Sequence, residues 1–282
     1  MTELPRLFDL HNRVAIVTGG AGLLGSEFCL TLAQAGARVM VADLDAESAA
    51  ATTAQLSEQG LVAQAARLDV TDPVSVRSLI STTLAAFGRL DILVNSAALD
   101  PKMDPEHLAG KAPENRAGPN LTSFEHFPLE AWKQALDVNL TGMFLCSQAA
   151  VQPMLTQGQG VIINLSSIYG LAAPDQRLYD RPGQPTHYKP PYYSATKAGV
   201  LGLTQYLAAY YAGKNIRVNA LTPGGVYNGH DETFAQAYAA RTVIGRMAEK
   251  DEMNGALLFL ASDASTYMTG ANLVVDGGWT TW

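Results

Sequence analysis

The stretch VAIVTGGAGLLG, residues 14–25, sets the expected fold of this chain. Four apolar residues of strand type run into a glycine-rich turn, and apolar residues at helical spacing follow at Phe28, Leu32 and Ala35. A strand, a glycine turn and a helix N-terminus together form an anion site, because exposed N–H groups and the helix dipole favour a pyrophosphate. The turn alone also fits a tight strand-to-helix connection without a ligand, so its context must decide.

Short apolar runs alternate with longer amphipathic stretches along the chain. The runs that predict strands are Val14–Val17, Arg38–Ala42, Ala63–Leu68, Ile92–Val94, Val161–Leu165, Arg217–Leu221 and Leu273–Val275. The stretches that predict helices include Ala46–Ser57, Val74–Phe87, Leu129–Met154, Ala195–Tyr211 and Asp251–Leu260. This alternation predicts an α/β fold in which crossover connections build a parallel sheet covered on both faces. We expect one doubly wound Rossmann domain over residues 1–282, with a parallel seven-stranded sheet.

Two segments break this rhythm, Leu99–Phe127 and Gly170–Pro191. Both are rich in turn-forming residues, and each follows an apolar strand, where α/β sheets place their ligands. We interpret them as two enlarged substrate loops, although a pair of surface excursions is the plainer alternative.

Composition limits the classes of partner. The 282 residues are 48% hydrophobic and carry a formal net charge of -7, which disfavours nucleic acid and anionic membranes. No apolar run approaches the roughly 20 residues that span a bilayer, and the N-terminus does not resemble a signal peptide. Cys29 and Cys146 lack metal-ligand spacing, so we expect buried thiols and no metal site. A cytoplasmic protein is the simplest expectation.

A carboxylate marks the second predicted strand. Asp43 lies about 20 residues beyond the glycines, where an acidic side chain binds the adenosine ribose hydroxyls. Its carboxylate would repel the 2′-phosphate of NADP, and neither position 20 nor position 44 holds an Arg or Lys that would bind that phosphate. We therefore expect NAD rather than NADP. The alternative is that Asp43 or Asp45 only caps the next helix. Asp69-Val70 could meet the adenine edge, and the small residues of Asn95–Ala98 leave room for a flat ligand.

A tyrosine and a lysine share one helix face at Tyr193 and Lys197. A free tyrosine has a pKa of about 10, and a nearby ammonium favours its phenolate form. Ser167 follows the fifth predicted strand and can present a hydroxyl to the same cleft. Asn139 interrupts an apolar helix, where it either bridges to a neighbouring backbone or serves the site.

Taken together, the chain resembles the short-chain dehydrogenase/reductase family over nearly its whole length. The features that carry the resemblance occur in the order of the family. They are the glycine turn Thr18–Gly25, Asp69, the segment Asn95–Ala98, Asn139, Ser167, Tyr193, Lys197, Pro223-Gly224 and Val275-Asp276-Gly277-Gly278.

The resemblance implies a nicotinamide-dependent alcohol dehydrogenase (EC 1.1.1.-). Tyr193 would act as the acid/base, Ser167 would hold the substrate oxygen, and Lys197 would lower the tyrosine pKa and bind the nicotinamide ribose. Asn139 would hold a proton-relay water, and the backbone of Val226 would contact the carboxamide. The implied cofactor-binding residues are Gly19, Gly22, Leu23, Leu24, Gly25, Asp43, Leu44, Asp69, Val70, Asn95, Ala97, Tyr193, Lys197, Pro223, Gly224 and Val226. The candidate substrate-binding residues, which include two cations of the second long loop, are Ser167, Tyr169, Arg177, Lys189, Tyr193 and Gly225.

The chain departs from the family pattern in places. The single-domain branch of the family usually has a glycine at the position of Leu23. Here the glycine falls one place earlier, at Gly22, so the turn is similar to that of the extended branch of the family. Many of those are sugar-nucleotide epimerases or dehydratases, so this remains one alternative; a non-catalytic NAD-binding scaffold is another. A threonine usually follows the Pro-Gly turn, and Asn228 or a backbone group would have to replace it here.

The two long loops indicate the substrate class. Their polar side chains suit a sugar, sugar acid or polyol, with or without an anionic group, better than a steroid or acyl chain, although each could simply face solvent. They are Arg116, Gln176, Arg177, Tyr179, Arg181, His187 and Lys189. The resemblance also implies a homotetramer or homodimer, for which Leu201, Tyr206, Tyr210, Tyr211, Trp279 and Trp282 could supply contacts.

Overall fold

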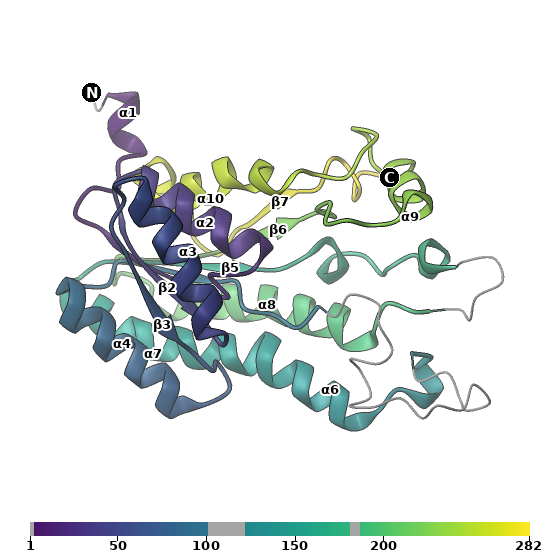
Figure 1. The fold of residues 1–282 in the computed structure, drawn as a ribbon, viewed down its shortest axis with the longest axis horizontal. Helices are drawn as coiled ribbons and strands as arrows, with labels where there is room; N and C mark the ends of the chain where they lie inside the picture. Colours follow the sequence, from purple (N-terminus) through teal and green to yellow (C-terminus); the bar gives the residue numbers. More distant parts are fainter. Residues whose placement is uncertain (1–2, 101–121, 181–186) are drawn as a thin grey trace.

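The computed structural model describes residues 3–100, 122–180 and 187–282. Within them, seven strands form one all-parallel sheet in the order β3-β2-β1-β4-β5-β6-β7 (Figure 1). The strands are β1 (Val14–Thr18), β2 (Arg38–Asp43), β3 (Ala63–Arg67), β4 (Ile92–Asn95), β5 (Gly160–Leu165), β6 (Ile216–Pro223) and β7 (Asn272–Val275). The predicted Rossmann-like α/β fold and its parallel seven-stranded sheet are confirmed.

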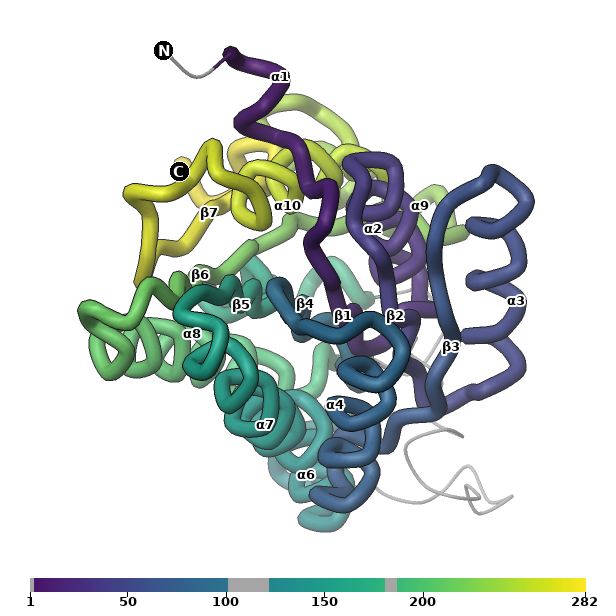
Figure 2. The backbone as a smooth tube through the Cα atoms, turned by 90° about the vertical axis from the view of Figure 1, so that its left-hand side faces the viewer, coloured from purple at the N-terminus to yellow at the C-terminus, as the bar shows by residue number. Residues whose placement is uncertain are grey.

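Helices cover both faces of the sheet, as the end-on view of Figure 2 shows. One face carries α2 (Leu23–Gln34), α3 (Ala46–Glu58) and α10 (Asn254–Ala261). The other carries α4 (Pro73–Phe87), α6 (Leu129–Leu136), α7 (Gly142–Gln157) and α8 (Pro191–Tyr210). The short helices α1 (Leu4–Leu7) and α9 (Glu232–Ala239) lie at opposite ends of the molecule in Figure 1.

Alternate residues of each strand pack into two separate cores. On β1, Ala15 and Val17 face the layer of α2, α3 and α10, whereas Val14 and Ile16 face the layer of α4, α7 and α8. All four side chains are fully buried, because successive side chains point to opposite faces of a strand and helices cover both. Cys29 and Cys146 are free and buried, one in each core, as expected.

The predicted element boundaries hold within a few residues, with two instructive differences. The long helix that contains Tyr193 begins at Pro191 rather than at Tyr193 or Ala195. Proline suits the first turn of a helix, since its missing N–H would have no partner there. The single helix expected over Leu129–Met154 is divided by a π-helical stretch, η2 (Asp137–Thr141), that contains Asn139.

Two further short helices, α1 and α9, were not expected. Among the described residues, no helix combines the length and apolar character needed to cross a membrane. Because all strands run parallel, their carboxyl ends lie along one edge of the sheet, and the connections that leave this edge surround the cavity described next.

Candidate active site

A cavity of about 940 Å³ opens at the carboxyl ends of the strands. Its volume lies at the upper end of the roughly 300–1,000 Å³ typical of small-molecule sites. Most residues expected from the sequence line it. These are Gly19, Gly22, Leu23, Leu24, Gly25, Asp43, Leu44, Asp69, Val70, Ala97, Ser167, Tyr169, Lys189, Tyr193, Lys197, Pro223, Gly224, Gly225 and Val226.

The glycine turn fits a dinucleotide phosphate. Gly19 adopts a left-handed φ of 64° and packs on Ala97, and a Cβ added at Gly25 would lie 1.9 Å from the Gly19 carbonyl oxygen. Helix α2 therefore begins against the turn itself. Its N-cap, Gly22, has no side chain to satisfy the first N–H groups, which belong to residues that line the cavity. The donors and the dipole of α2 are thus directed at the space that a pyrophosphate would fill.

Two neighbouring carboxylates differ in what they contact: Asp45 caps a helix, and Asp43 faces the cavity. Asp45 caps α3 by accepting hydrogen bonds from the N–H groups of Glu47 at 3.0 Å and Ser48 at 3.2 Å. Asp43 lies at the end of β2 in the cavity wall, where its Oδ2 accepts from the Ala21 N–H at 3.0 Å. This bond fixes the Asp43 carboxylate beside the glycine turn, where it would meet a ribose.

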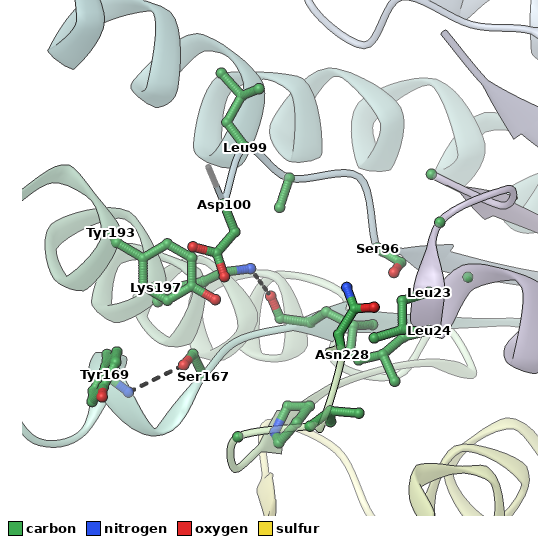
Figure 3. Close-up of a pocket in the computed structure, with 18 of the residues that line it drawn as sticks. Leu23, Leu24, Ser96, Leu99, Asp100, Ser167, Tyr169, Tyr193, Lys197 and Asn228 are labelled. Atoms are coloured by element: carbon green, nitrogen blue, oxygen red, sulfur yellow. Dashed lines mark hydrogen bonds between the residues drawn. The ribbon is translucent and has the colours of Figure 1, made fainter. Parts of the chain in front are cut away.

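The segment after β6 presents backbone to the cavity. An isolated bridge pairs Val226 with Ala248, and its hydrogen bonds are made by Gly225 O and Tyr227 N, the neighbours of Val226. Val226 is thereby held in the cavity wall as expected for a backbone contact to the cofactor. Asn228 also lines the cavity and lies near Leu23 and Leu24 in Figure 3.

The four side chains expected to catalyse come from three elements, and one of them, Asn139, lies in η2 and is described below. Tyr193 and Lys197 lie on α8, and Ser167 caps the short helix η3 (Ile168–Gly170) directly after β5. The Lys197 ammonium is buried, donates to the Leu165 carbonyl oxygen at 2.8 Å and lies 5.7 Å from the centroid of the Tyr193 ring. Ser167 and Tyr193 point into the same space in Figure 3, which leaves both hydroxyls available to one substrate oxygen.

The electrostatics of the pair differ from the sequence expectation. Burial raises the pKa of Tyr193 well above its usual value, and the nearby Asp100 carboxylate raises this pKa further, whereas Ser167 lowers it by hydrogen bonding. Burial lowers the pKa of Lys197 to about 8, although Asp100 favours its charged form. The expected lowering of the Tyr193 pKa by Lys197 is therefore not seen here, because desolvation dominates both groups.

Asn139 and Asn95 lie beneath the cavity rather than in its lining. The Asn139 side chain bridges to the backbone of Leu99, accepting from its N–H at 2.6 Å and donating to its carbonyl oxygen at 3.1 Å. This is the bridging role that the sequence left open, and it anchors the start of the first long loop. Asn95 Nδ2 donates to Ser147 at 3.0 Å and to Asn164 at 2.9 Å, so its side chain joins β4 to β5 and α7 instead of facing a ligand.

Arg177 does not line the cavity, contrary to expectation. Its side chain is 82% exposed and donates two hydrogen bonds to the Asp175 carboxylate, which also accepts from Arg241 just after α9. The pairing turns Arg177 outward and ties the short helix η4 (Gln176–Tyr179) to α9. Of the other expected loop residues, His187 and Tyr179 line the cavity, whereas Arg116 and Arg181 lie outside the described residues.

Two features were not expected from the sequence: the Asp100 carboxylate in the cavity and the stacked rings of Tyr238 and Trp279. Asp100 lines the cavity, where it pairs with Lys189 and lies beside Tyr193 and Lys197 (Figure 3). Its only sequence signal was its place just after the fourth strand. Tyr238 of α9 stacks on Trp279 with ring centroids 4.3 Å apart and accepts a hydrogen bond from the Gly225 N–H.

The i, i+4 spacing of Phe234 and Tyr238 behind the capping Asp231 could have revealed helix α9.

Among the described residues, no group of three His, Cys, Asp or Glu side chains is placed to hold a metal ion.

Comparison with known proteins identifies relatives over nearly the whole chain. The family model described as enoyl-(acyl carrier protein) reductase matches residues 23–280. The chain is 36% identical over 278 residues to a D-threitol dehydrogenase of Mycolicibacterium smegmatis, covering 97% of this chain and 95% of the relative. It is 37% identical over 272 residues to a cis-4-hydroxycyclohexanecarboxylate dehydrogenase of Sinomonas cyclohexanicum, covering 95% and 96%. A 3-alpha-(or 20-beta)-hydroxysteroid dehydrogenase of Mycobacterium bovis is 36% identical over 269 residues, covering 95% and 90%.

Solved structures show the same fold over the whole chain. A short-chain type dehydrogenase/reductase from Mycobacterium marinum superposes with a TM-score of 0.83 at 31% identity and covers 99% of both chains. A gluconate 5-dehydrogenase from Burkholderia cenocepacia, solved in complex with NADP and tartrate, has the same TM-score and identity and covers 99% of this chain and 100% of its own.

Proposed function

The chain belongs to the short-chain dehydrogenase/reductase family and is an oxidoreductase, and from this premise we propose that it uses NAD to interconvert a secondary alcohol and a carbonyl on a polar, hydroxyl-rich substrate. The observation that carries the proposal is the meeting of Tyr193, Ser167 and Lys197 at the end of a cavity whose other end is the glycine turn with Asp43. One cavity thus joins an acid/base to a nucleotide site.

Tyr193 moves the proton at the substrate oxygen in this proposal. Its pKa is raised by burial, so the phenol is protonated at neutral pH and is ready to donate to a carbonyl oxygen. In the direction of alcohol oxidation, the phenolate takes the hydroxyl proton. Ser167, whose Oγ also accepts from the Tyr169 N–H at 3.2 Å, holds the same oxygen through its own proton.

The bound nicotinamide would exchange the hydride with the substrate carbon, and the positive charge of its oxidised ring would favour the Tyr193 phenolate. Lys197 is placed to bind the ribose hydroxyls, because its buried ammonium uses one donor on Leu165 and keeps further donors for the cavity. Asn139 supports the site by fixing the backbone of Leu99. We propose that it also holds a water that relays the proton.

The preference for NAD rests on Asp43. A 2′-phosphate bound in the same way would face this fixed carboxylate, and repulsion between two anions at close range costs several-fold in affinity or more. The gluconate 5-dehydrogenase from Burkholderia cenocepacia was solved with NADP, so this fold also binds NADP, and the choice of NAD by this chain depends on Asp43.

The hydroxyl-rich substrate class rests on the polar groups near Tyr193, which are Asp100, His187 and Lys189. The D-threitol dehydrogenase relative supports a polyol, whereas the hydroxysteroid relative stands for the competing apolar class. We also propose a cytoplasmic homotetramer or homodimer. The exposed, mutually stacked rings of Tyr206 and Tyr210 on α8 support a subunit contact, which sedimentation would test.

The test is a substrate panel with the purified protein, read by the absorbance of the reduced cofactor. Polyols, sugar acids, apolar secondary alcohols and steroids are each offered with NAD and with NADP. We expect turnover with NAD on polyols or sugar acids. Turnover confined to steroids and apolar alcohols would refute the substrate class, and binding of NADH without any turnover would favour the scaffold alternative.

A further inference from the structure

We propose that Asp100 and Lys189 form a recognition pair for a hydroxyl group on the carbon next to the reacting carbon, so that neutral vicinal diols and polyols are the preferred substrates. This inference rests on the proposed alcohol dehydrogenase function and names the chemistry that selects among alcohols. The starting observation is an ion pair inside the cavity: the Lys189 ammonium contacts Asp100 Oδ1, and both side chains line the space in front of Tyr193.

The pair is positioned by the long loops from which its members come. Lys189 is held by a two-point contact, in which its N–H donates to the Gln176 side chain at 2.8 Å and its carbonyl oxygen accepts from the same amide at 3.3 Å. Asp100 follows Leu99, whose backbone is bridged to Asn139. Both charged groups therefore lie on backbone that is fixed from outside the cavity.

Lys189 lies close to the reacting group. Its ammonium is 4.2 Å from the centroid of the Tyr193 ring and 6.0 Å from that of Tyr169, and its side chain is only 11% exposed. Figure 3 shows the Asp100 carboxylate beside the Tyr193 hydroxyl and the end of Lys197. A substrate whose reacting oxygen meets Tyr193 and Ser167 would place a neighbouring oxygen against this pair.

The chemistry of the pair suits a hydroxyl better than other groups. A hydroxyl both donates and accepts, so it can donate to the Asp100 carboxylate and accept from the Lys189 ammonium at the same time. Hydrogen bonds to charged groups contribute more than neutral ones, and a polar pair built for a hydroxyl discriminates strongly against an analogue that lacks it.

An anionic substrate group is disfavoured by the same arrangement. Lys189 already has a carboxylate partner, so a substrate carboxylate would have to displace Asp100 or lie against it. Either choice leaves one anion without its cation in a partly buried site. The pair thus favours neutral polyols over hydroxy acids.

A third polar group supports a hydroxyl-rich ligand. His187 lines the cavity, and its Nδ1 is buried without a hydrogen-bond partner among the described residues. A buried polar atom without a partner costs free energy, which a further substrate hydroxyl would recover.

The experiment compares three small secondary alcohols of matched size with NAD: butane-2,3-diol, butan-2-ol and 3-hydroxybutanoate. The proteins are wild type, Asp100→Asn, Lys189→Met and the control Glu125→Gln, which changes an exposed carboxylate on the same long loop outside the cavity. NADH affinity, measured by fluorescence, reports whether each variant keeps its folded cofactor site.

We expect wild type to prefer the diol to the mono-alcohol in kcat/KM by at least about 10-fold, the size expected for charge-assisted hydrogen bonds. Both cavity variants should lose most of this preference, because their kcat/KM falls further on the diol than on butan-2-ol, and Glu125→Gln should match wild type. Asp100→Asn should also gain activity on 3-hydroxybutanoate, because Lys189 is then free for a carboxylate.

Equal losses on the diol and the mono-alcohol would overturn the inference, since the pair would then act on the site as a whole. An undiminished diol preference in both variants would overturn it as well. If wild type oxidises alcohols without preferring the diol, the inference fails and the proposed function stands. If wild type oxidises no alcohol, the proposed function itself fails.

Discussion

The nucleotide wall of the cavity, formed by the glycine turn and Asp43, and its substrate wall, formed around Asp100 and Lys189, are built in different ways. The first uses two neighbouring strands and the helix between them, and its groups are fixed by backbone contacts such as Ala21 N–H to Asp43. The second joins residues of separate long loops through side-chain pairs. In the proposed function, short and regular spacing therefore builds the cofactor site, whereas side-chain pairing between distant loops selects the substrate.

The strongest test of the nucleotide wall is Gly25→Ala. A Cβ at this position would lie 1.9 Å from the Gly19 carbonyl oxygen, so the turn and helix α2 must separate. We expect roughly 100-fold weaker NADH binding by fluorescence titration, the order that an overpacking cost of a few kcal/mol implies. The matched control is Gly255→Ala, where an added Cβ meets nothing within 4 Å. Unchanged affinity in Gly25→Ala would contradict the assigned phosphate site.

Cofactor choice should depend on one carboxylate of the nucleotide wall. Asp43→Asn keeps an acceptor for the Ala21 N–H and removes the negative charge, so the ratio of kcat/KM for NAD to that for NADP should fall by about 10-fold or more. Asp45→Asn is the control, because asparagine caps a helix as well as aspartate does. If both variants keep the wild-type ratio, Asp43 does not set the preference.

The aromatic part of the substrate wall should give a smaller effect. Tyr238→Phe keeps the stacking on Trp279 and removes the hydroxyl that accepts from the Gly225 N–H. Losing this intramolecular hydrogen bond costs about 1 kcal/mol of folding stability, so we expect the melting temperature to fall by roughly 2–4 °C. Because Gly225 lines the cavity, kcat/KM should fall as well, by no more than about 5-fold. A loss as large as that of a catalytic residue would assign Tyr238 a role in the reaction itself.

The smallest expected effect is a shift in the pH profile of alcohol oxidation. Oxidation needs the Tyr193 phenolate together with the Lys197 ammonium. Because the pKa of Lys197, about 8, lies below the raised pKa of Tyr193, kcat/KM should rise with pH up to the lower of the two pKa values and decline above the higher one. Asp100 raises both pKa values, while Tyr169 and Tyr192 also raise that of Tyr193 and Lys189 lowers that of Lys197.

Removing the charge in Asp100→Asn should therefore move both limbs of the profile to lower pH. A shift to higher pH, or none, would contradict the place of Asp100 beside the acid/base.

These walls also separate what the sequence could predict from what it could not. The strands, the glycine turn, Asp43 and the Tyr193–Lys197 pair follow from periodicity and from short spacings, which a single chain displays directly. The ion pair of Asp100 with Lys189 depends on how two irregular loops approach each other, and no local pattern encodes that approach.

Three expectations differ from the structure for the same reason. Arg177 was expected in the cavity because it is a cation in a substrate loop, but Asp175 lies two residues away and holds it outside. Asn95 was expected to face the cofactor, but its side chain satisfies buried partners between strands and helix. Lys197 was expected to lower the pKa of Tyr193, but spacing shows the nearby ammonium and not the burial, which raises this pKa in the protein alone.

The central claim is that Tyr193 exchanges the proton with the substrate oxygen. The most direct measurement is the single-turnover rate of NADH formation in Tyr193→Phe saturated with NAD and substrate, with Tyr206→Phe on the exposed part of the same helix as the control. We expect Tyr193→Phe to bind NAD with wild-type affinity and to form NADH at a rate lower by roughly 10²–10⁴-fold, the usual contribution of a general acid/base. A variant that binds NAD normally and forms NADH at the wild-type rate would contradict it.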